Sequence, residues 1–432
     1  MESCWWVFKR LFDDGQVYRA YQIMPFSTAL GTPLSHMEER QNEKSTVDPA
    51  VVVAFPVVGV EGQEKTSLLT YTTTPWTLPS NLLIAVNPGL EYVKVFDEKS
   101  QTHYILLESY LPTLYKNSKT AKYKVVQRLV GKEMVGWKYK PLYESFVEQF
   151  PDCFEVIEAD YVEAGEGTGL VHQAPAFGQE DYDAAYAAGF INKAHLPPCP
   201  VDNKGCFTDE VPDYEGQHVK AADKAIIRDL RPTGRLLLET QVTHTDKFCP
   251  RSQTQLIRKA ISAWFIRVRN STPEILNNLE KTNWVPNSVK EKRFANWISN
   301  ARDWNVSRNR YWGTPLPLWV SDDFEEVVCV GSREELRRLS GYDGSLDDLH
   351  RDKIDHITIP SQQGKGVLRR VDEVFDCWFV PKITIFAVLP VLTNLPKGSN
   401  PEACPMRPIT IHSKTKIALS KTSSLPTSLL KV

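Results

Sequence analysis

The N-terminal segment of the chain has the spacing of an amphipathic helix. In CWWVFKRLFDDG, Trp5, Phe8 and Phe12 recur every three or four residues, and Gly15 follows the last of them. Apolar side chains at this spacing share one face of a helix, and glycine is common just past a helix end. Because a buried helix rarely opens a domain without a strand to pack against, we expect the whole protein to have further sequence upstream of Met1.

Residues 48–245 follow a strand-rich pattern. Apolar runs separated by turn residues are AVVVAFPV, TSLLTYTTT, NLLIAVNP, EYVKVF and HYILLE, and two helical stretches follow, EDYDAAYAAG and HVKAADKAIIRDL. In the second helical stretch Val219, Ala222, Ile226 and Leu230 make one apolar stripe. Runs of strands followed by helices predict a self-contained α+β or β-barrel-like domain.

Two further segments complete the chain. Helical and aromatic segments return over residues 246–379, among them ISAWFIRV and REELRRLS. The last 53 residues, 380–432, contain one acidic residue and one aromatic residue against seven prolines and seven Lys or Arg. A segment of this composition cannot bury a core, so we predict a disordered, low-complexity tail, and its apolar run ITIFAVLPVL is too short to span a bilayer.

Composition narrows the possible functions. The chain is 42% hydrophobic and 10% aromatic with a formal net charge of -2, which indicates a globular protein without the overall basicity of many nucleic-acid-binding domains. The N-terminus lacks the apolar core of a signal peptide, which favours the cytosol. Eight cysteines are scattered without any Cys-x-x-Cys pair, so we expect free thiols and no structural zinc.

The stretch TTTPWTLPSN, residues 72–81, places three hydroxyls side by side before Pro75. Threonine favours strands and proline ends them, so the stretch is compatible with an ordinary strand end. Adjacent residues of a strand point to opposite faces, however, and the prolines force the chain to turn there. A strand end of this kind is able to point Thr72, Thr73 and Thr74 into a pocket, and the residues alone leave both interpretations open.

A second stretch, EGTGLVHQAPAFGQEDYDAA, carries His172 after a short apolar strand and Asp181 where a helix begins. Its glycines fit neither the Gly-x-Gly-x-x-Gly fingerprint nor a phosphate-binding loop. An acid at a helix start often interacts with free amides or with the helix dipole, and a lone histidine is often structural. Functional and structural roles therefore stay open for both residues.

Together these two stretches closely resemble the editing domain of class I aminoacyl-tRNA synthetases for branched aliphatic amino acids. The form Pro75-Trp76-Thr77-Leu78-Pro79 resembles the isoleucyl enzymes of the eukaryotic cytosolic type, whereas the valyl and leucyl relatives usually carry an Arg-Pro-Glu/Asp-Thr form. The resemblance continues through PFSTALGTPLS, WNVSRNRYWGTPLPLW and VDEVFDCWF, and ends near Phe379. It implies an α/β chain in which a partial class I, Rossmann-type core is interrupted by the inserted editing domain, with residues 1–47 and 246–379 belonging to the nucleotide-binding core.

The resemblance also implies roles for individual residues. Thr72, Thr73 and Thr74 would line the editing pocket with hydroxyls, Asn81 would support the terminal ribose, and Trp76 and His172 would wall the side-chain pocket so that isoleucine is excluded. Asp181 would hold the α-ammonium of the misattached amino acid. The expected reaction is hydrolysis of valyl-tRNA(Ile) by a positioned water, and whether His172 also acts as a base is left open by the sequence.

The family's main reaction is attachment of isoleucine to tRNA(Ile) with ATP and Mg²⁺; editing itself would need no cofactor. The chain lacks the His-Ile-Gly-His and Lys-Met-Ser-Lys-Ser sequences that hold ATP in this family, so we expect a form truncated at both ends that retains mainly editing. The resemblance adds tRNA(Ile), isoleucine, mischarged valine and a multi-synthetase assembly as partners, with no membrane. Alternatives are a non-catalytic tRNA-binding truncation product and a valine or leucine relative.

Overall fold

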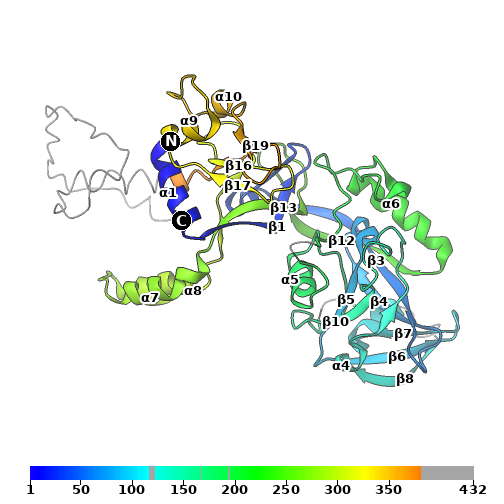
Figure 1. The fold of residues 1–432 in the computed structure, drawn as a ribbon. Coiled ribbons are helices and arrows are strands. Elements are labelled where there is room, and N and C mark those ends of the chain that lie inside the picture. Colours follow the sequence, from blue (N-terminus) through cyan, green and yellow to red (C-terminus); the bar gives the residue numbers. More distant parts are fainter. Residues whose placement is uncertain (116–121, 166, 193–194, 381–432) are drawn as a thin grey trace. The chain divides into compact units, whose positions relative to one another are not determined.

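The computed structural model describes residues 1–115, 122–165, 167–192 and 195–380 (Figure 1). The chain forms two compact units. The larger unit contains residues 11–313 and 372–376, and the smaller unit contains residues 1–10, 314–371 and, of the described residues, 377–380. The predicted tail, 380–432, lies outside the described residues except for Val380.

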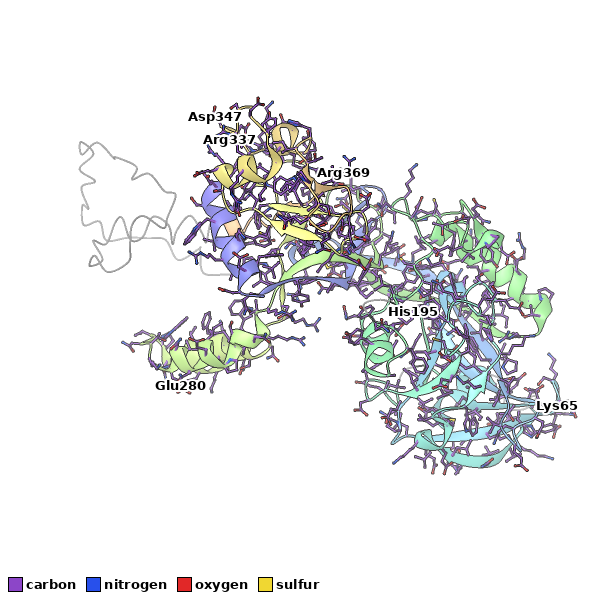
Figure 2. All side chains as sticks on the ribbon, in the orientation of Figure 1. Lys65, His195, Glu280, Arg337, Asp347 and Arg369 are labelled. Carbon is purple, nitrogen blue, oxygen red and sulfur yellow. The ribbon has the colours of Figure 1, made fainter. Side chains whose placement is uncertain are left out.

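The larger unit is built on a ten-stranded sheet. Nine of its strands follow the order β11-β5-β10-β9-β3-β4-β7-β6-β8, and the tenth, β12, pairs with β3. Lys65, in the turn before β4, lies at an exposed end of this sheet (Figure 2). The strands of the sheet are β3 (Glu43–Val58), β4 (Thr66–Thr72), β5 (Leu83–Val86), β6 (Glu91–Asp97), β7 (Thr102–Leu106), β8 (Tyr123–Val130), β9 (Lys138–Tyr139), β10 (Glu155–Glu158), β11 (Leu170–Gln173) and β12 (Leu236–Lys247).

The burial of apolar side chains stabilises this sheet. The central strands β3 and β5 are buried along runs of consecutive residues, as expected for strands covered on both faces. The helices of this part are α2 (His36–Glu39), α3 (Leu111–Leu114), α4 (Gly131–Met134), α5 (Gln179–Ala187) and α6 (Val219–Leu230), with the 3₁₀ helix η1 at Pro75–Ser80. The predicted stripe of α6 is confirmed, because Val219, Ala222, Ile226 and Leu230 are all buried in the main core cluster.

A second sheet of the larger unit has the order β14-β13-β1-β2. Its main pair joins β1 (Val17–Ser27) to β13 (Ile257–Ile266) in an antiparallel register from Val17 opposite Ile266 to Phe26 opposite Ile257. The grouping of ISAWFIRV with helical segments is therefore wrong for most of its length. A short run of apolar, β-branched and aromatic residues has no decisive period, and ten residues of pairing with β1 decide for a strand.

The remaining α-helices and strands of the larger unit are short. They are β2 (Thr32–Pro33), α7 (Thr272–Glu280), α8 (Ala295–Ser299), β14 (Trp304–Asn305), β15 (Ser307–Arg308) and β20 (Val374–Phe375). Helices α7 and α8 contact each other, and Glu280, the last residue of α7, is labelled in Figure 2. Strands β15 and β20 pair with each other, although 65 residues of sequence separate them.

The smaller unit brings the N-terminal helix together with a four-stranded sheet of order β17-β16-β19-β18. Trp5 is fully buried, donates from Nε1 to the carbonyl of Pro315 at 2.9 Å and packs edge-on against Trp319. The predicted N-terminal helix and the predicted helix REELRRLS are both confirmed. The elements are α1 (Glu2–Asp13, which belongs to this unit as far as residue 10), β16 (Leu318–Val320), β17 (Val327–Cys329), α9 (Arg333–Ser340), α10 (Arg351–Ile354), β18 (Ile359–Pro360) and β19 (Val367–Arg370).

The predicted domain boundaries fall within strands. Strands β3 and β12 pair without a break from Lys247 opposite Glu43 to Thr240 opposite Ala50, so one antiparallel ribbon crosses both residue 48 and residue 245. Among the described residues, the parallel strand pairs are β5 with β10 and β4 with β7. The chain is thus a mixed α/β structure, and the Rossmann-type core remains a prediction. None of the described helices is long and apolar enough to cross a bilayer.

Candidate active site

The threonine stretch forms a sharp turn between β4 and η1. Proline at position 75 ends the strand and begins the 3₁₀ helix, and Thr74 bridges the two with φ -126° and ψ 71°. Thr72 Oγ1 accepts a hydrogen bond from the amide of Thr74 at 3.1 Å and lies 3.2 Å from Thr74 Oγ1. Thr77 Oγ1 donates to the carbonyl of Thr74 at 2.8 Å. These bonds hold the hydroxyls in one connected network.

His172 is buried at the side of this network, on β11. Asn81 Nδ2 donates to the carbonyl of Leu83 at 3.0 Å and lies 3.1 Å from Nδ1 of His172, so Nδ1 is the accepting nitrogen. The imidazole proton is therefore on Nε2, which lies 2.9 Å from Thr77 Oγ1. Burial lowers the pKa of His172 to about 4, so the ring is neutral at pH 7 with both nitrogens engaged.

Asp181 lies in the first turn of α5, with its carboxylate folded back toward the helix start. Oδ2 accepts from the amide of Ala174 at 3.0 Å, and Oδ1 accepts from the hydroxyl of Tyr161 at 3.3 Å. Burial raises the pKa of Asp181 to about 6, against the opposing effect of these two donors. A Cβ on Gly178 would lie 2.6 Å from Oδ2, so only glycine leaves room for this conformation. Ala174 and Tyr161 both precede α5, so these bonds are not contacts with the amides at the start of the helix, and they hold the carboxylate in the pocket wall.

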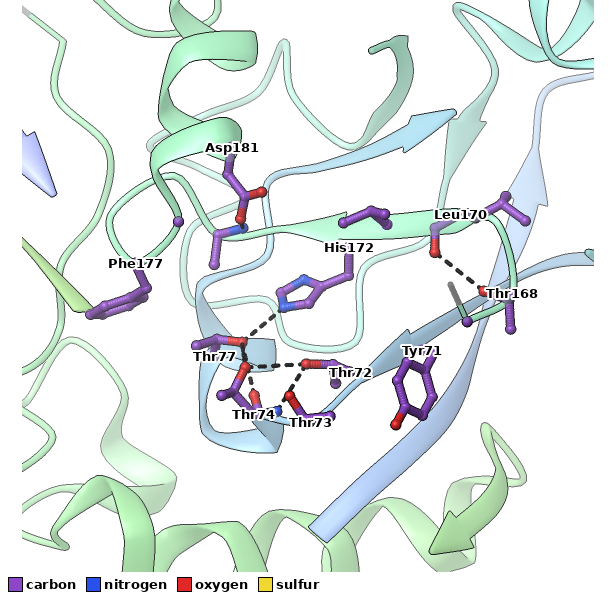
Figure 3. A pocket seen from close by; sticks show the side chains of 14 residues that line it. Tyr71, Thr72, Thr73, Thr74, Thr77, Thr168, Leu170, His172, Phe177 and Asp181 are labelled. Atoms are coloured by element: carbon purple, nitrogen blue, oxygen red, sulfur yellow. Dashed lines mark hydrogen bonds between the residues drawn. The ribbon is translucent and has the colours of Figure 1, made fainter. Parts of the chain in front are cut away.

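The structure brings most of the predicted site residues to one pocket of about 470 Å³ (Figure 3). The threonine turn and His172 form one side, and Asp181 lies across from Thr77 beyond the histidine ring (Figure 3). The residues that line the pocket are Tyr71, Thr72, Thr73, Thr74, Thr77, Gly167, Thr168, Leu170, Val171, His172, Ala174, Phe177, Gly178 and Asp181.

Trp76 and Asn81 lie one layer behind this wall. Trp76 packs edge-on against Phe177 with ring centroids 4.8 Å apart, and it is Phe177 that lines the pocket. Asn81 is buried, accepts from the hydroxyl of Tyr139 at 2.8 Å and orients His172. The structure thus gives both residues contacts with the wall from behind, and neither is among the lining residues.

Several lining residues were missed by sequence reasoning. Tyr71 ends the apolar strand before the threonines, and Gly167 allows the chain to pass close to it: a Cβ there would lie 3.0 Å from Cβ of Tyr71, at a φ of +58°. Phe177 occurs in the quoted motif, but no role was predicted for it. The glycines around residue 167 were tested only as a nucleotide fingerprint, although the same signal also marks a close approach of two chain segments.

A second group of titratable residues lies where β3, β12 and α6 meet. Ligand atoms of Asp48, His244 and Asp246 all lie within 4.8 Å of one another. Lys220 Nζ is 3.3 Å from Asp48, and Gln255 donates to Asp48 at 3.0 Å and also to Asp246. Burial alone would raise the pKa of Asp48, but Lys220 and these donors lower it. The protein's own donors occupy these oxygens, so the group is a hydrogen-bonded network.

Residues 1–400 match the family of class I tRNA synthetases for I, L, M and V, and the chain belongs to this family. The match ends 21 residues beyond Phe379, where the quoted motifs stop. The chain is 57% identical over 380 residues to the cytoplasmic isoleucine--tRNA ligase of Saccharomyces cerevisiae, covering 88% of this chain and 35% of that protein. For the ligase of Schizosaccharomyces pombe the identity is 56% with the same coverage, and for that of Mus musculus it is 53%, covering 30% of the mouse protein. The predicted resemblance to the cytosolic isoleucyl enzymes is confirmed, and the chain spans about a third of their length.

Solved structures similar to this chain include editing domains of cytosolic leucyl-tRNA synthetases. The P. knowlesi domain is 13% identical with a TM-score of 0.35, covering 46% of this chain and 97% of that one. The P. falciparum domain is 10% identical with a TM-score of 0.34, covering 44% of this chain and 99% of that one.

Proposed function

We propose that this chain carries the editing site of an isoleucyl-tRNA synthetase and hydrolyses the ester of valyl-tRNA(Ile). The observation that carries the proposal is the meeting of the Asp181 carboxylate and the threonine hydroxyls in one pocket. An aminoacyl ester presents an ammonium group next to a carbonyl that becomes negatively charged during attack. A carboxylate and a set of hydroxyl and amide donors suit these two features.

Asp181 binds the α-ammonium in this proposal. With a pKa of about 6 the carboxylate is mostly ionised at pH 7, and a bound ammonium group stabilises the charged form further. The two donors on its oxygens, Ala174 and Tyr161, fix its direction before substrate arrives. Such a preformed contact orients the ester within the pocket without a cost in side-chain ordering.

Hydrolysis then proceeds by a positioned water. The water oxygen attacks the ester carbonyl carbon, and hydroxyls of the threonine turn donate to the oxyanion. The bond to the terminal ribose oxygen breaks, a proton from the water passes to that oxygen, and valine leaves with its new carboxyl group. His172 takes no proton, because its accepting nitrogen is bonded to Asn81 and its pKa is about 4. Its role is that of a neutral wall.

The need for a second site follows from the size of the difference between the two amino acids. One methylene changes binding in an apolar pocket by only about 1–3 kcal/mol, and the isoleucine–valine pair of this enzyme family is itself the standard case of that limit. A smaller pocket that admits valine and excludes isoleucine removes the remaining errors. His172, buried beside the threonines, limits the space on that side.

For the whole protein we propose ATP-dependent attachment of isoleucine to tRNA(Ile) in the cytoplasm, because the similar proteins are named cytoplasmic isoleucine--tRNA ligases. ATP, with Mg²⁺, is a substrate of that reaction. The 432 residues contain neither of the family's ATP motifs. The multi-synthetase assembly remains a prediction from the family resemblance.

The experiment compares two acids on the same helix. Asp181→Ala should slow single-turnover hydrolysis of valyl-tRNA(Ile) about tenfold to a hundredfold, the loss expected for one charge-assisted hydrogen bond. Asp183→Ala is the control, since Asp183 is exposed on the same helix and accepts a hydrogen bond from Gln179. Equal rates for the parent and both variants, with unchanged melting, would overturn the proposal, and tRNA binding without turnover would favour the non-catalytic alternative.

A further inference from the structure

Asp223 is a buried acid that the proposed reaction does not use. It lies on α6, is 3% exposed, and sits on the same side of the helix as the apolar stripe. Burial raises its pKa to about 7, against the opposing charge of Lys220. A carboxyl group in such a place costs stability unless it makes a specific bond. The bond it makes is to the backbone of the threonine turn: Oδ1 accepts from the amide of Trp76 at 2.9 Å.

The start of η1 explains why this bond matters. The first residue of the helix, Pro75, has no amide hydrogen, and the amide of Thr77 bonds to the carbonyl of Thr74 at 2.9 Å. Trp76 is thus the residue whose amide needs an acceptor from outside the helix. The N-cap residue Thr74 makes no side-chain cap bond, so Asp223, 147 positions away, supplies the cap.

The turn that is capped carries the pocket's hydroxyls. Thr74 immediately precedes Pro75, and Thr77 follows Trp76, so the amide bonded to Asp223 lies between two lining residues. Thr77 in turn bonds Nε2 of His172 at 2.9 Å. Loss of the bond to the Trp76 amide would therefore free Thr74 and Thr77 to move, and with them the contact to His172. Asp223 itself is not a lining residue.

We propose that Asp223 is a positioning residue of the editing site, which holds the threonine turn in its active conformation through the Trp76 amide. The inference rests on the proposed hydrolysis for its effect on rate, but the anchor itself is a property of the fold. The contact needs a hydrogen-bond acceptor, and a negative charge is not required. An asparagine at this position keeps a side-chain oxygen for the amide, whereas alanine keeps none.

The test uses the full chain with Asp223→Ala, Asp223→Asn and Lys224→Ala. Lys224 is exposed on the same helix and serves as the matched control. We expect Asp223→Ala to lower kcat for valyl-tRNA(Ile) about tenfold with KM changed less than about twofold, because the substrate does not touch Asp223. Asp223→Asn should stay within about threefold of the parent, which a general loss of packing would not produce.

Hydrogen exchange of peptides spanning residues 73–80 gives a readout independent of activity. We expect faster exchange in Asp223→Ala alone; unchanged exchange in that variant overturns the anchor. If Asp223→Ala does not fold, Asp223→Leu, which keeps the volume and removes the acceptor, takes its place. Failure of the parent chain to hydrolyse valyl-tRNA(Ile) would overturn the proposed function. The hydrogen-exchange result tests the bond between Asp223 and the Trp76 amide whether or not the parent is active.

Discussion

His172 and Asp181 line the same pocket, yet burial shifts their pKa values in opposite directions, to about 4 and about 6. The histidine side of the pocket is neutral, and both ring nitrogens are bonded to neighbours in the fold. The carboxylate on the other side ionises near neutral pH. Burial disfavours the charged form of both groups; the histidine is neutral at pH 7, whereas the carboxylate is mostly ionised there because its raised pKa of about 6 still lies below 7.

The two sides of the pocket are also held by different contacts. The side with His172 depends on a chain of hydrogen bonds through Thr77, Thr74 and Thr72, and any change there propagates along the turn. The Asp181 side depends on two donors and on the absence of a side chain at Gly178. In the proposed function the first side therefore sets the shape of the pocket, and the second side binds the ammonium group of the substrate.

The largest effect expected from the difference between His172 and Asp181 is on how the free energy of unfolding changes with pH. The pKa of His172 in the folded state lies below its usual 6.5. Its contribution to the free energy of unfolding is therefore lost as the pH falls from about 6.5 to 4, by about 3 kcal/mol. The folded-state pKa of Asp181 lies above 3.8, so its contribution is lost as pH rises from about 4 to 6, by a similar amount. In the parent the two trends offset each other.

Removing one group should expose the other trend. Urea unfolding at several pH values between 4 and 6.5 should show Asp181→Asn losing stability on acidification relative to the parent, and His172→Gln losing stability as the pH rises. The comparison with the parent cancels the other titrating groups. Parallel curves for all three proteins would contradict the opposite pKa shifts of His172 and Asp181.

A smaller effect is expected on selectivity. His172→Ala removes part of the wall, so the cognate isoleucyl ester should enter and the preference for the valyl ester should fall about tenfold, within the range that one methylene allows. Deacylation of both esters by the variant and the parent measures this ratio. An unchanged ratio would mean that His172 does not limit the side-chain pocket.

The smallest effect concerns Gly178. A methyl group there would meet Oδ2 of Asp181 at 2.6 Å and force the carboxylate from its position, at a cost of about 1 kcal/mol. Gly178→Ala should therefore slow valyl-ester hydrolysis about threefold to tenfold. Gly165→Ala, where a Cβ meets nothing within 4 Å, is the control and should leave the rate unchanged. Equal slowing in both would point to a general effect of the substitutions.

Much of this site was accessible from the sequence because the residues occur in two compact motifs. The threonines, His172 and Asp181 were predicted together from the family resemblance, and the apolar runs predicted the strand that ends at Thr72 and the strand that carries His172. The layer behind was not: Trp76 and Asn81 were assigned to the pocket itself, because a motif gives neighbours in sequence but not depth from a surface. The pairing of β1 with β13, far apart in the chain, likewise exceeds what the local pattern of ISAWFIRV determines.

Asp223 illustrates a signal that was present but unused. In HVKAADKAIIRDL it stands next to Ala222 on the apolar side of the stripe, four residues after Val219 and three before Ile226. An acid at such a position must find a donor in the core, so it marks a specific contact. Its partner, a backbone amide 147 residues away, follows only from the packing of α6 on η1.

The most direct measurement is single-turnover deacylation of valyl-tRNA(Ile) and isoleucyl-tRNA(Ile) by the purified chain under identical conditions. The account predicts that the valyl ester is hydrolysed faster, because the pocket accepts its side chain beside His172 and binds its ammonium at Asp181. Equal rates for the two esters, or no hydrolysis of either by a folded chain, would contradict it.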